Sequence, residues 1–211
     1  MKLRFLAAFL LLATLAFSQA TKSTDHKAAN KKAAAPAAAQ QGPPKPAPEQ
    51  GKIMKMFSGK WTVEATMAAT PFGPADTGTG TETNYRGPGG YSVLTNTTMK
   101  FAKMGPLSGH GVMWWDPQAK TYMGIWCDNW GPCSNDGPGQ WEGDKLIFTN
   151  DMKMGERTVK ARQTFSDITA DGFTFVLEMS DASGAMQPWM NFKYTRAAAA
   201  AAPAAPKEEK K

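Results

Sequence analysis

Between Phe57 and Arg196 the chain alternates apolar and polar residues with a period of two, and turn-forming residues interrupt the alternation every eight to twelve residues. This alternation gives each strand one buried and one solvated face, whereas a helix needs an apolar stripe of longer period. The pattern recurs with no convincing helix between the segments, so it predicts one antiparallel sheet. A long sheet closes to remove its exposed edges. We therefore predict an all-β, up-and-down β-barrel of about eight to ten strands, with a short helical turn before it over residues 51–57.

The first twenty residues have the anatomy of a secretory signal peptide. Two cations, Lys2 and Arg4, precede an apolar run from Phe5 to Phe17, and the small residues Ser18 and Ala20 occupy the −3 and −1 positions of a cleavage site. The apolar run is too short to span the roughly 30 Å of bilayer hydrocarbon. An uncleaved anchor is the alternative; we expect cleavage, and an exported protein without a transmembrane segment afterwards.

The remaining composition predicts one folded domain over residues 51–196. Residues 21–50 are rich in Ala, Lys, Pro and Gln, and residues 197–211 combine an Ala run with charged residues. Neither segment holds enough apolar surface to fold, so we expect a disordered linker and a disordered tail. Repeats are absent from the sequence, and the domain is expected to be a monomer.

The basic character of the chain belongs to its N-terminal part. Residues 1–56 carry nine cationic and two acidic side chains, whereas residues 57–196 carry twelve and fourteen. A folded domain with this balance offers no basic face for a phosphate backbone, so nucleic acid is not an expected partner. The basic linker is expected to be a solvated spacer, with contact to anionic envelope polymers or membrane surface as the alternative.

Two cysteines, Cys127 and Cys133, flank the turn-forming sequence Asp-Asn-Trp-Gly-Pro. A close, even pair in an exported protein is usually a disulfide. Redox chemistry favours a C-x-x-C spacing at a helix N-terminus, which is not the pattern here. We therefore predict a structural disulfide.

Several motifs resemble one family of proteins. Gly59-Lys60-Trp61 resembles the G-x-W opening of lipocalin-like (calycin) barrels, in which a basic residue of the last strand lies across the Trp ring; Arg196 is the matching residue. The run from Ser108 to Pro117, with the aromatic and Gly positions that follow it, is similar to exported bacterial lipocalin-like domains of unknown function. The resemblance covers about residues 52–196 and implies structural roles for Gly59, Trp61 and Arg196. It brings no catalytic residues.

Aromatic residues are numerous in the predicted barrel, and they define the candidate ligand site. Interiors lined by aromatic rings and methionines bind apolar ligands, although the same residues also fill cores. Of the neighbours Trp114 and Trp115, one should face inward and the other outward. The predicted interior ligand-binding residues are Trp61, Tyr91, Trp114, Trp126 and Phe175.

Metal and haem sites are weaker alternatives. Met54 and Met56, with Met152 and Met154, raise the possibility of Cu(I), but two methionines on one strand face are also what packing needs. His110, between two glycines, is a candidate haem ligand, although a lone strand histidine is more often structural. We predict no metal site and no cofactor.

Enzyme signatures are missing from the sequence: it has no Ser-His-Asp set with a nucleophile elbow and no phosphate-binding glycine loop. The leading hypothesis is an exported, non-enzymatic barrel that binds a small apolar or amphipathic ligand in its interior. The second is an envelope interaction module with a fully packed barrel. The third is a haem or copper carrier.

Overall fold

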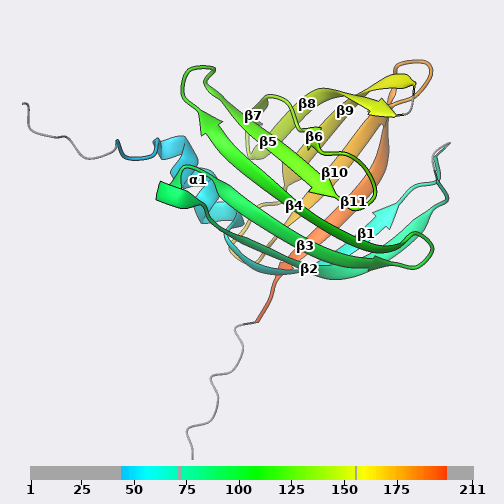
Figure 1. The fold of residues 1–211 in the computed structure, drawn as a ribbon, viewed down its shortest axis with the longest axis horizontal. Helices are drawn as coiled ribbons and strands as arrows, with labels where there is room; N and C mark the ends of the chain where they lie inside the picture. The colour runs from blue at the N-terminus through cyan, green and yellow to red at the C-terminus, as the bar shows by residue number, and fades with distance from the viewer. Residues whose placement is uncertain (1–43, 71–72, 155, 199–211) are drawn as a thin grey trace, which may run out of the picture. The chain divides into compact units, whose positions relative to one another are not determined.

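Ten antiparallel strands close into a barrel in the computed structural model (Figure 1). The structure describes residues 44–70, 73–154 and 156–198. The predicted signal peptide (1–20) and most of the predicted linker and tail lie outside these residues.

Each strand of the barrel pairs with its neighbours in sequence, and β1 pairs with β11 to close the ring. One further strand, β6, has only two residues and pairs with β5 outside the ring of ten. This confirms the predicted up-and-down barrel. The strands are β1 (Gly59–Met67), β2 (Asp76–Arg86), β3 (Val93–Phe101), β4 (Gly105–Asp116), β5 (Thr121–Asp128), β6 (Ser134–Asn135), β7 (Gly139–Glu142), β8 (Lys145–Met154), β9 (Arg157–Ser166), β10 (Gly172–Ser180) and β11 (Met186–Arg196).

The N-terminal helix α1 (Pro48–Phe57) lies at one end of the barrel (Figure 1). It is longer than the predicted turn and includes the last three residues of the predicted linker. Proline at the start of the helix and Glu49 in its first turn favour helix at this point. Ile53 and Phe57 are buried against the core and supply the energy that a short isolated helix lacks.

Polar contacts also join α1 to the strands. The side-chain oxygen of Gln50 accepts a hydrogen bond from the backbone N–H of Trp115, at 2.8 Å. The Tyr122 hydroxyl donates to the carbonyl oxygen of Glu49, at 3.2 Å. The helix therefore closes one end of the barrel.

The first and last strands meet as the resemblance implies. Trp61 is opposite Arg196 in the β1–β11 register, and the Arg196 guanidinium lies over the Trp61 ring, with Cζ 4.1 Å from the ring centroid. Gly59 has φ of 137°, and a Cβ there would overlap the Arg196 guanidinium. Glycine is therefore required at this position for conformation and for space.

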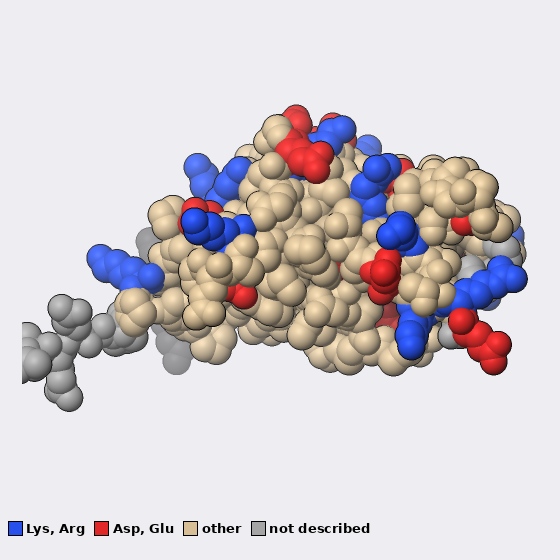
Figure 2. All heavy atoms as spheres, turned by 90° about the horizontal axis from the view of Figure 1, so that it is seen from above, with Lys and Arg blue, Asp and Glu red and all other residues tan. Residues whose placement is uncertain are grey.

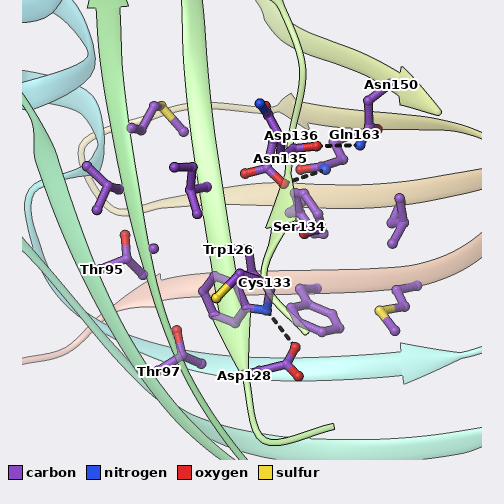
Figure 3. Close-up of a pocket in the computed structure, with 18 of the residues that line it drawn as sticks. Thr95, Thr97, Trp126, Asp128, Cys133, Ser134, Asn135, Asp136, Asn150 and Gln163 are labelled. Atoms are coloured by element: carbon purple, nitrogen blue, oxygen red, sulfur yellow. Dashed lines mark hydrogen bonds between the residues drawn. The ribbon is translucent and has the colours of Figure 1, made fainter. Parts of the chain in front are cut away.

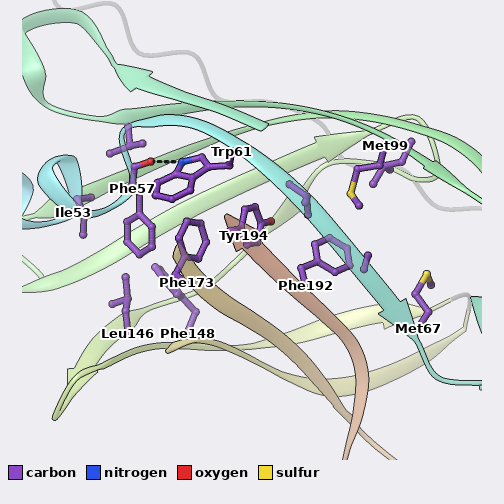
Figure 4. Packing of buried hydrophobic residues seen from close by; sticks show 14 of the residues in the cluster. Ile53, Phe57, Trp61, Met67, Met99, Leu146, Phe148, Phe173, Phe192 and Tyr194 are labelled. Carbon is purple, nitrogen blue, oxygen red and sulfur yellow. Dashed lines mark hydrogen bonds between the residues drawn. The ribbon is translucent and has the colours of Figure 1, made fainter. Parts of the chain in front are cut away.

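A mainly aromatic core fills the end of the barrel next to α1 (Figure 4). Trp61 is fully buried, and its indole Nε1 donates to the Phe57 carbonyl oxygen at 2.9 Å. Phe173 stacks on Tyr194 with ring centroids 4.1 Å apart and contacts Trp61 edge-on. Rings from α1, β1, β10 and β11 therefore pack directly on one another at this end of the barrel.

One junction of the ring has little backbone pairing. Strands β5 and β7 share a single residue pair, Tyr122 with Gly139. The chain between them, residues 129–138, is called the bridging segment below; it contains β6.

On the face of the molecule in Figure 2, cationic and acidic side chains are interspersed among uncharged ones.

Candidate functional site

The barrel holds a cavity of about 550 Å³. Pockets of roughly 300–1,000 Å³ are typical of small-molecule sites. Near α1, the cavity is lined by Phe57, Phe173 and Tyr194. At the opposite end of the barrel, where β8 ends, the cavity is lined by Met152 and Met154 (Figure 1). The lining is therefore mainly apolar, with polar groups gathered in two places.

The first polar group of the cavity lies deep, near α1. Glu82 of β2 pairs in register with Trp61 and with Thr97, and it is only 7% exposed. Its Oε2 accepts hydrogen bonds from the Thr97 hydroxyl at 2.7 Å and from the Tyr194 hydroxyl at 3.3 Å, and its Oε1 accepts from Asn84 Nδ2 at 2.8 Å. We call Glu82, Asn84, Thr97 and Tyr194 the deep polar cluster.

Burial dominates the electrostatics of this cluster. It raises the pKa of the Glu82 carboxyl, although the three donors favour the ionised form. Burial, with the nearby Glu82 charge, also raises the pKa of Tyr194 well above its ordinary value. The Asn84 side-chain oxygen is buried and has no hydrogen-bond partner among the described residues. The cluster thus presents an incompletely satisfied set of acceptors at the end of an apolar cavity.

The second polar group belongs to the bridging segment (Figure 3). Asp136 accepts a hydrogen bond from Gln163 Nε2 at 3.0 Å, and Asn150 Nδ2 donates to the Asn135 carbonyl oxygen at 2.6 Å. Burial raises the pKa of the Asp136 carboxyl. Side-chain hydrogen bonds therefore hold the wall of the cavity where strand pairing is sparse.

Trp126 extends across the β4 backbone beside the cavity. A Cβ on Gly109 would approach its Cζ2 to 2.5 Å, and one on Gly111 would approach its Cε3 to 3.1 Å. The two glycines therefore provide the space for the indole ring. Trp126 Nε1 donates to Asp128 Oδ2 at 2.7 Å, which fixes the orientation of the ring.

The predicted disulfide between Cys127 and Cys133 is confirmed. It joins the end of β5 to the bridging segment, and Cys133 lines the cavity. Asp128 Oδ1 accepts hydrogen bonds from the backbone N–H groups of Trp130 and Gly131, at 2.8 and 3.1 Å. Together these contacts fix the loop that forms part of the cavity wall.

Of the five residues predicted to bind ligand, Trp126 and Phe175 line the cavity. Trp61 does not line the cavity; its ring packs against Phe173 on one side and the Arg196 guanidinium on another. The interior placement of Tyr91 was wrong: it is 43% exposed, because it follows the 3₁₀ turn η1 (Pro88–Gly90) and precedes the start of β3.

The interior placement of Trp114 was also wrong. Its neighbour Trp115 packs on Tyr122, with ring centroids 4.9 Å apart, and Met113 lines the cavity, so Trp114 points to the outer face between them. Two adjacent tryptophans carry no period-two signal, so the sequence alone did not determine which faces inward.

The candidate metal and haem ligands do not converge. His110 is exposed and does not line the cavity; the space beside its flanking glycines holds Trp126 instead. Met54 and Met56 belong to α1, whereas Met152 and Met154 lie toward the other end of the barrel (Figure 1). Within the described residues, no cluster of three or more His, Cys, Asp or Glu side chains is placed to hold a metal ion.

Sequence reasoning missed the deep polar cluster. Strand β2 has few apolar residues, so neither of its faces could be recognised as interior. The available signal is that a barrel strand must turn one face inward even when both faces are polar; on β2 the inward set is Asp76, Gly78, Gly80, Glu82 and Asn84.

These features define a class of protein: a closed, up-and-down antiparallel barrel with an interior cavity that is apolar along most of its wall and polar at its deep end. A family model described as "Protein of unknown function (DUF1579)" matches residues 46–196. The chain belongs to this family.

Solved structures show the same fold. The chain is similar to Rv2717c from M. tuberculosis, with 12% identity, a TM-score of 0.53, and coverage of 72% of this chain and 99% of that one. It is also similar to the S-type phycobiliprotein lyase CPES from Guillardia theta, with 8% identity, a TM-score of 0.50, and coverage of 71% and 93%. Comparison with curated proteins found no match. Where the structure describes the chain, none of its helical segments has the length and apolar character needed to cross a membrane.

Proposed function

We propose that this protein is an exported, non-enzymatic barrel that binds a small amphipathic ligand in its interior and acts by sequestering or carrying it. The observation that supports the proposal is the cavity of about 550 Å³, whose wall is mainly apolar and carries polar groups at its deep end and in the bridging segment. Burial of the apolar part of a ligand would supply affinity, and the polar end would orient it. A fully packed interaction module would need no such cavity.

The polar groups support holding rather than transforming a ligand. The hydroxyl groups of Thr97 and Tyr194 both donate to Glu82, and the Asn84 side-chain oxygen accepts from no donor in the described part of the chain. This arrangement suits a head group that donates a hydrogen bond to the Asn84 oxygen and is then released unchanged. Mass spectrometry of ligand extracted after incubation tests this point: a covalently altered ligand would contradict the non-enzymatic proposal.

Export is supported by the disulfide, since such bonds persist in oxidising compartments. The proposed signal peptide ends at Ala20. Expression in a bacterial host followed by mass spectrometry of the mature chain is expected to find Thr21 at the N-terminus. Retention of the first twenty residues would contradict cleavage.

Ligand binding is tested with Nile red, a neutral dye that fluoresces in apolar surroundings. We expect saturable binding by the full mature chain. Thr95→Trp fills part of the cavity and should weaken dye binding by about tenfold or more, which corresponds to about 1.4 kcal/mol. Thr98→Trp adds the same side chain on the opposite face of β3, where Thr98 is exposed, and should leave affinity unchanged. Absence of saturation, or equal effects of the two variants, would overturn the proposal.

A further inference from the structure

Glu82 is a buried carboxyl, and no cationic side chain of the residues that the structure describes pairs with it. Its three hydrogen-bond donors, on Thr97, Asn84 and Tyr194, are all neutral groups. The two ion pairs found in the described part of the chain, Lys160–Asp151 and Arg162–Glu178, lie elsewhere. A buried charge is normally paired, because desolvation is otherwise uncompensated. The deep end of the cavity therefore lacks a positive charge that a ligand could supply.

Asn84 provides a second, independent observation. It is 5% exposed and lines the cavity, and its amide nitrogen is committed to Glu82. Its side-chain oxygen receives no hydrogen bond from any residue within 44–70, 73–154 and 156–198. Buried acceptors are rarely left without a partner. A ligand group that donates hydrogen bonds would satisfy this oxygen and the neighbouring carboxylate together.

The charge of the cavity wall favours the same kind of ligand. Glu82, Asp128 and Asp136 all line the cavity. Among its described lining residues the one cation is Lys153, which is exposed and lies on the part of β8 near the β8–β9 turn. A carboxylate head group would meet the like charge of Glu82 at the deep end, whereas a cation would meet an opposite charge there.

We propose that the ligand is an amphipathic amine whose ammonium group is bound by the Glu82 carboxylate and the free oxygen of Asn84. This inference rests on the proposed function and adds the chemical class of the ligand. An ammonium group has several N–H donors, enough for both acceptors. Its apolar tail would then lie along Phe175, Leu177 and Met190 toward the end of the barrel opposite α1.

The test compares three twelve-carbon ligands that differ in head group, each below its solubility limit and micelle concentration, as competitors of Nile red at neutral pH. Dodecylamine is expected to bind at least about tenfold tighter than dodecanol, because charged hydrogen bonds are the stronger kind, and dodecanoate is expected to bind most weakly. An amine that binds no tighter than the alcohol, or a carboxylate that binds tightest, would overturn the inference.

Two variants locate the effect. Glu82→Gln should lower dodecylamine affinity to that of dodecanol while leaving dodecanol binding in place. Glu64→Gln, an exposed carboxyl on the neighbouring strand β1, is the matched control and should keep the amine preference. Persistence of the full preference in E82Q would overturn the assignment to Glu82. Should E82Q fail to fold, the ranking of ligands by the wild-type protein still decides. A fourth ligand, trimethyldodecylammonium, has the positive charge but no N–H donors, so it should bind more weakly than the primary amine. If it binds as tightly as dodecylamine, the role of Asn84 is contradicted.

The outcomes separate this inference from the proposed function. If Nile red binds saturably and all three twelve-carbon ligands displace it equally, the barrel binds apolar ligands and the amine inference is wrong. If Nile red itself does not bind, the proposed function and the inference fall together.

Discussion

Arg196 lies across the indole of Trp61, with its Cζ 4.1 Å from the ring centroid, so the last residue of β11 covers the first inward-facing ring of β1. The guanidinium also donates to the carbonyl oxygens of Ala170 and Ser58. One side chain thus connects the closing pair of strands to the β9–β10 loop and to the end of α1.

Arg196→Ala removes these contacts and is expected to lower the free energy of unfolding by about 1–2 kcal/mol, the range of a partly desolvated cation–π contact with its hydrogen bonds. Urea denaturation measures the change. Lys193→Ala on the same strand removes an exposed cation and is the control. Equal losses in the two variants would show that charge, and not the contact with Trp61, is responsible.

The Cys127–Cys133 disulfide should contribute stability and hold the cavity wall. The double variant C127S/C133S is expected to lose about 2 kcal/mol, because the bond closes only a short loop. Wild-type protein treated with reductant should lose the same amount in urea denaturation. Nile red affinity should fall in both, since Cys133 lines the cavity; unchanged affinity would mean that the loop keeps its position without the bond.

The raised pKa of Glu82 makes part of the stability depend on pH. The folded protein retains the Glu82 proton to a higher pH than the unfolded chain, so the contribution is fully present below the unfolded pKa of about 4.3 and is lost as pH rises through the folded pKa. The unfolding free energy of the wild type should therefore fall relative to that of E82Q as pH rises from acid to neutral. Asp136 is present in both proteins, so its similar effect cancels. Parallel pH profiles would contradict the raised pKa.

The glycines of β4 should control the position of Trp126. A methyl group at Gly109 overlaps the indole, so Gly109→Ala is expected to displace the ring, cost about 1–3 kcal/mol by overpacking, and shift the tryptophan emission spectrum. Gly51→Ala in α1 adds the same methyl group where, apart from the adjoining backbone of the helix, no atom of the described residues lies within 4 Å. That control should be neutral or slightly stabilising, because alanine favours helix. An unchanged spectrum in G109A would contradict the role of Gly109 in seating the ring.

The fold was predictable because its signals are local or pairwise. Alternation along Trp61, Val63, Ala65 and Met67 identifies an inward face that the structure confirms as buried. The disulfide followed from the spacing of two cysteines, and the contact of Arg196 with Trp61 from the family resemblance.

The candidate site was less predictable because its signals depend on closure of the barrel. Trp114 and Trp115 could be assigned to inner and outer faces only once their register with β5 was known. Glu82 looked like an ordinary solvated residue of a polar strand, and only the opposing Tyr194, far away in sequence, shows that it is enclosed. The start of α1 was missed because its stability comes from the barrel end it covers.

The junction between β5 and β7 has fewer backbone residue pairs than the other junctions of the barrel, so the strands are not held together equally around the ring. Nine of its ten neighbouring strand pairs share at least four residue pairs, but this one depends on Tyr122 with Gly139, supported by hydrogen bonds such as that between Gln163 and Asp136. Backbone amides of residues 129–138 should accordingly exchange with deuterium far sooner than those of β1 or β11. If the barrel takes up a ligand as proposed, we expect the ligand to enter where β5 and β7 separate, because this separation breaks the fewest backbone pairs.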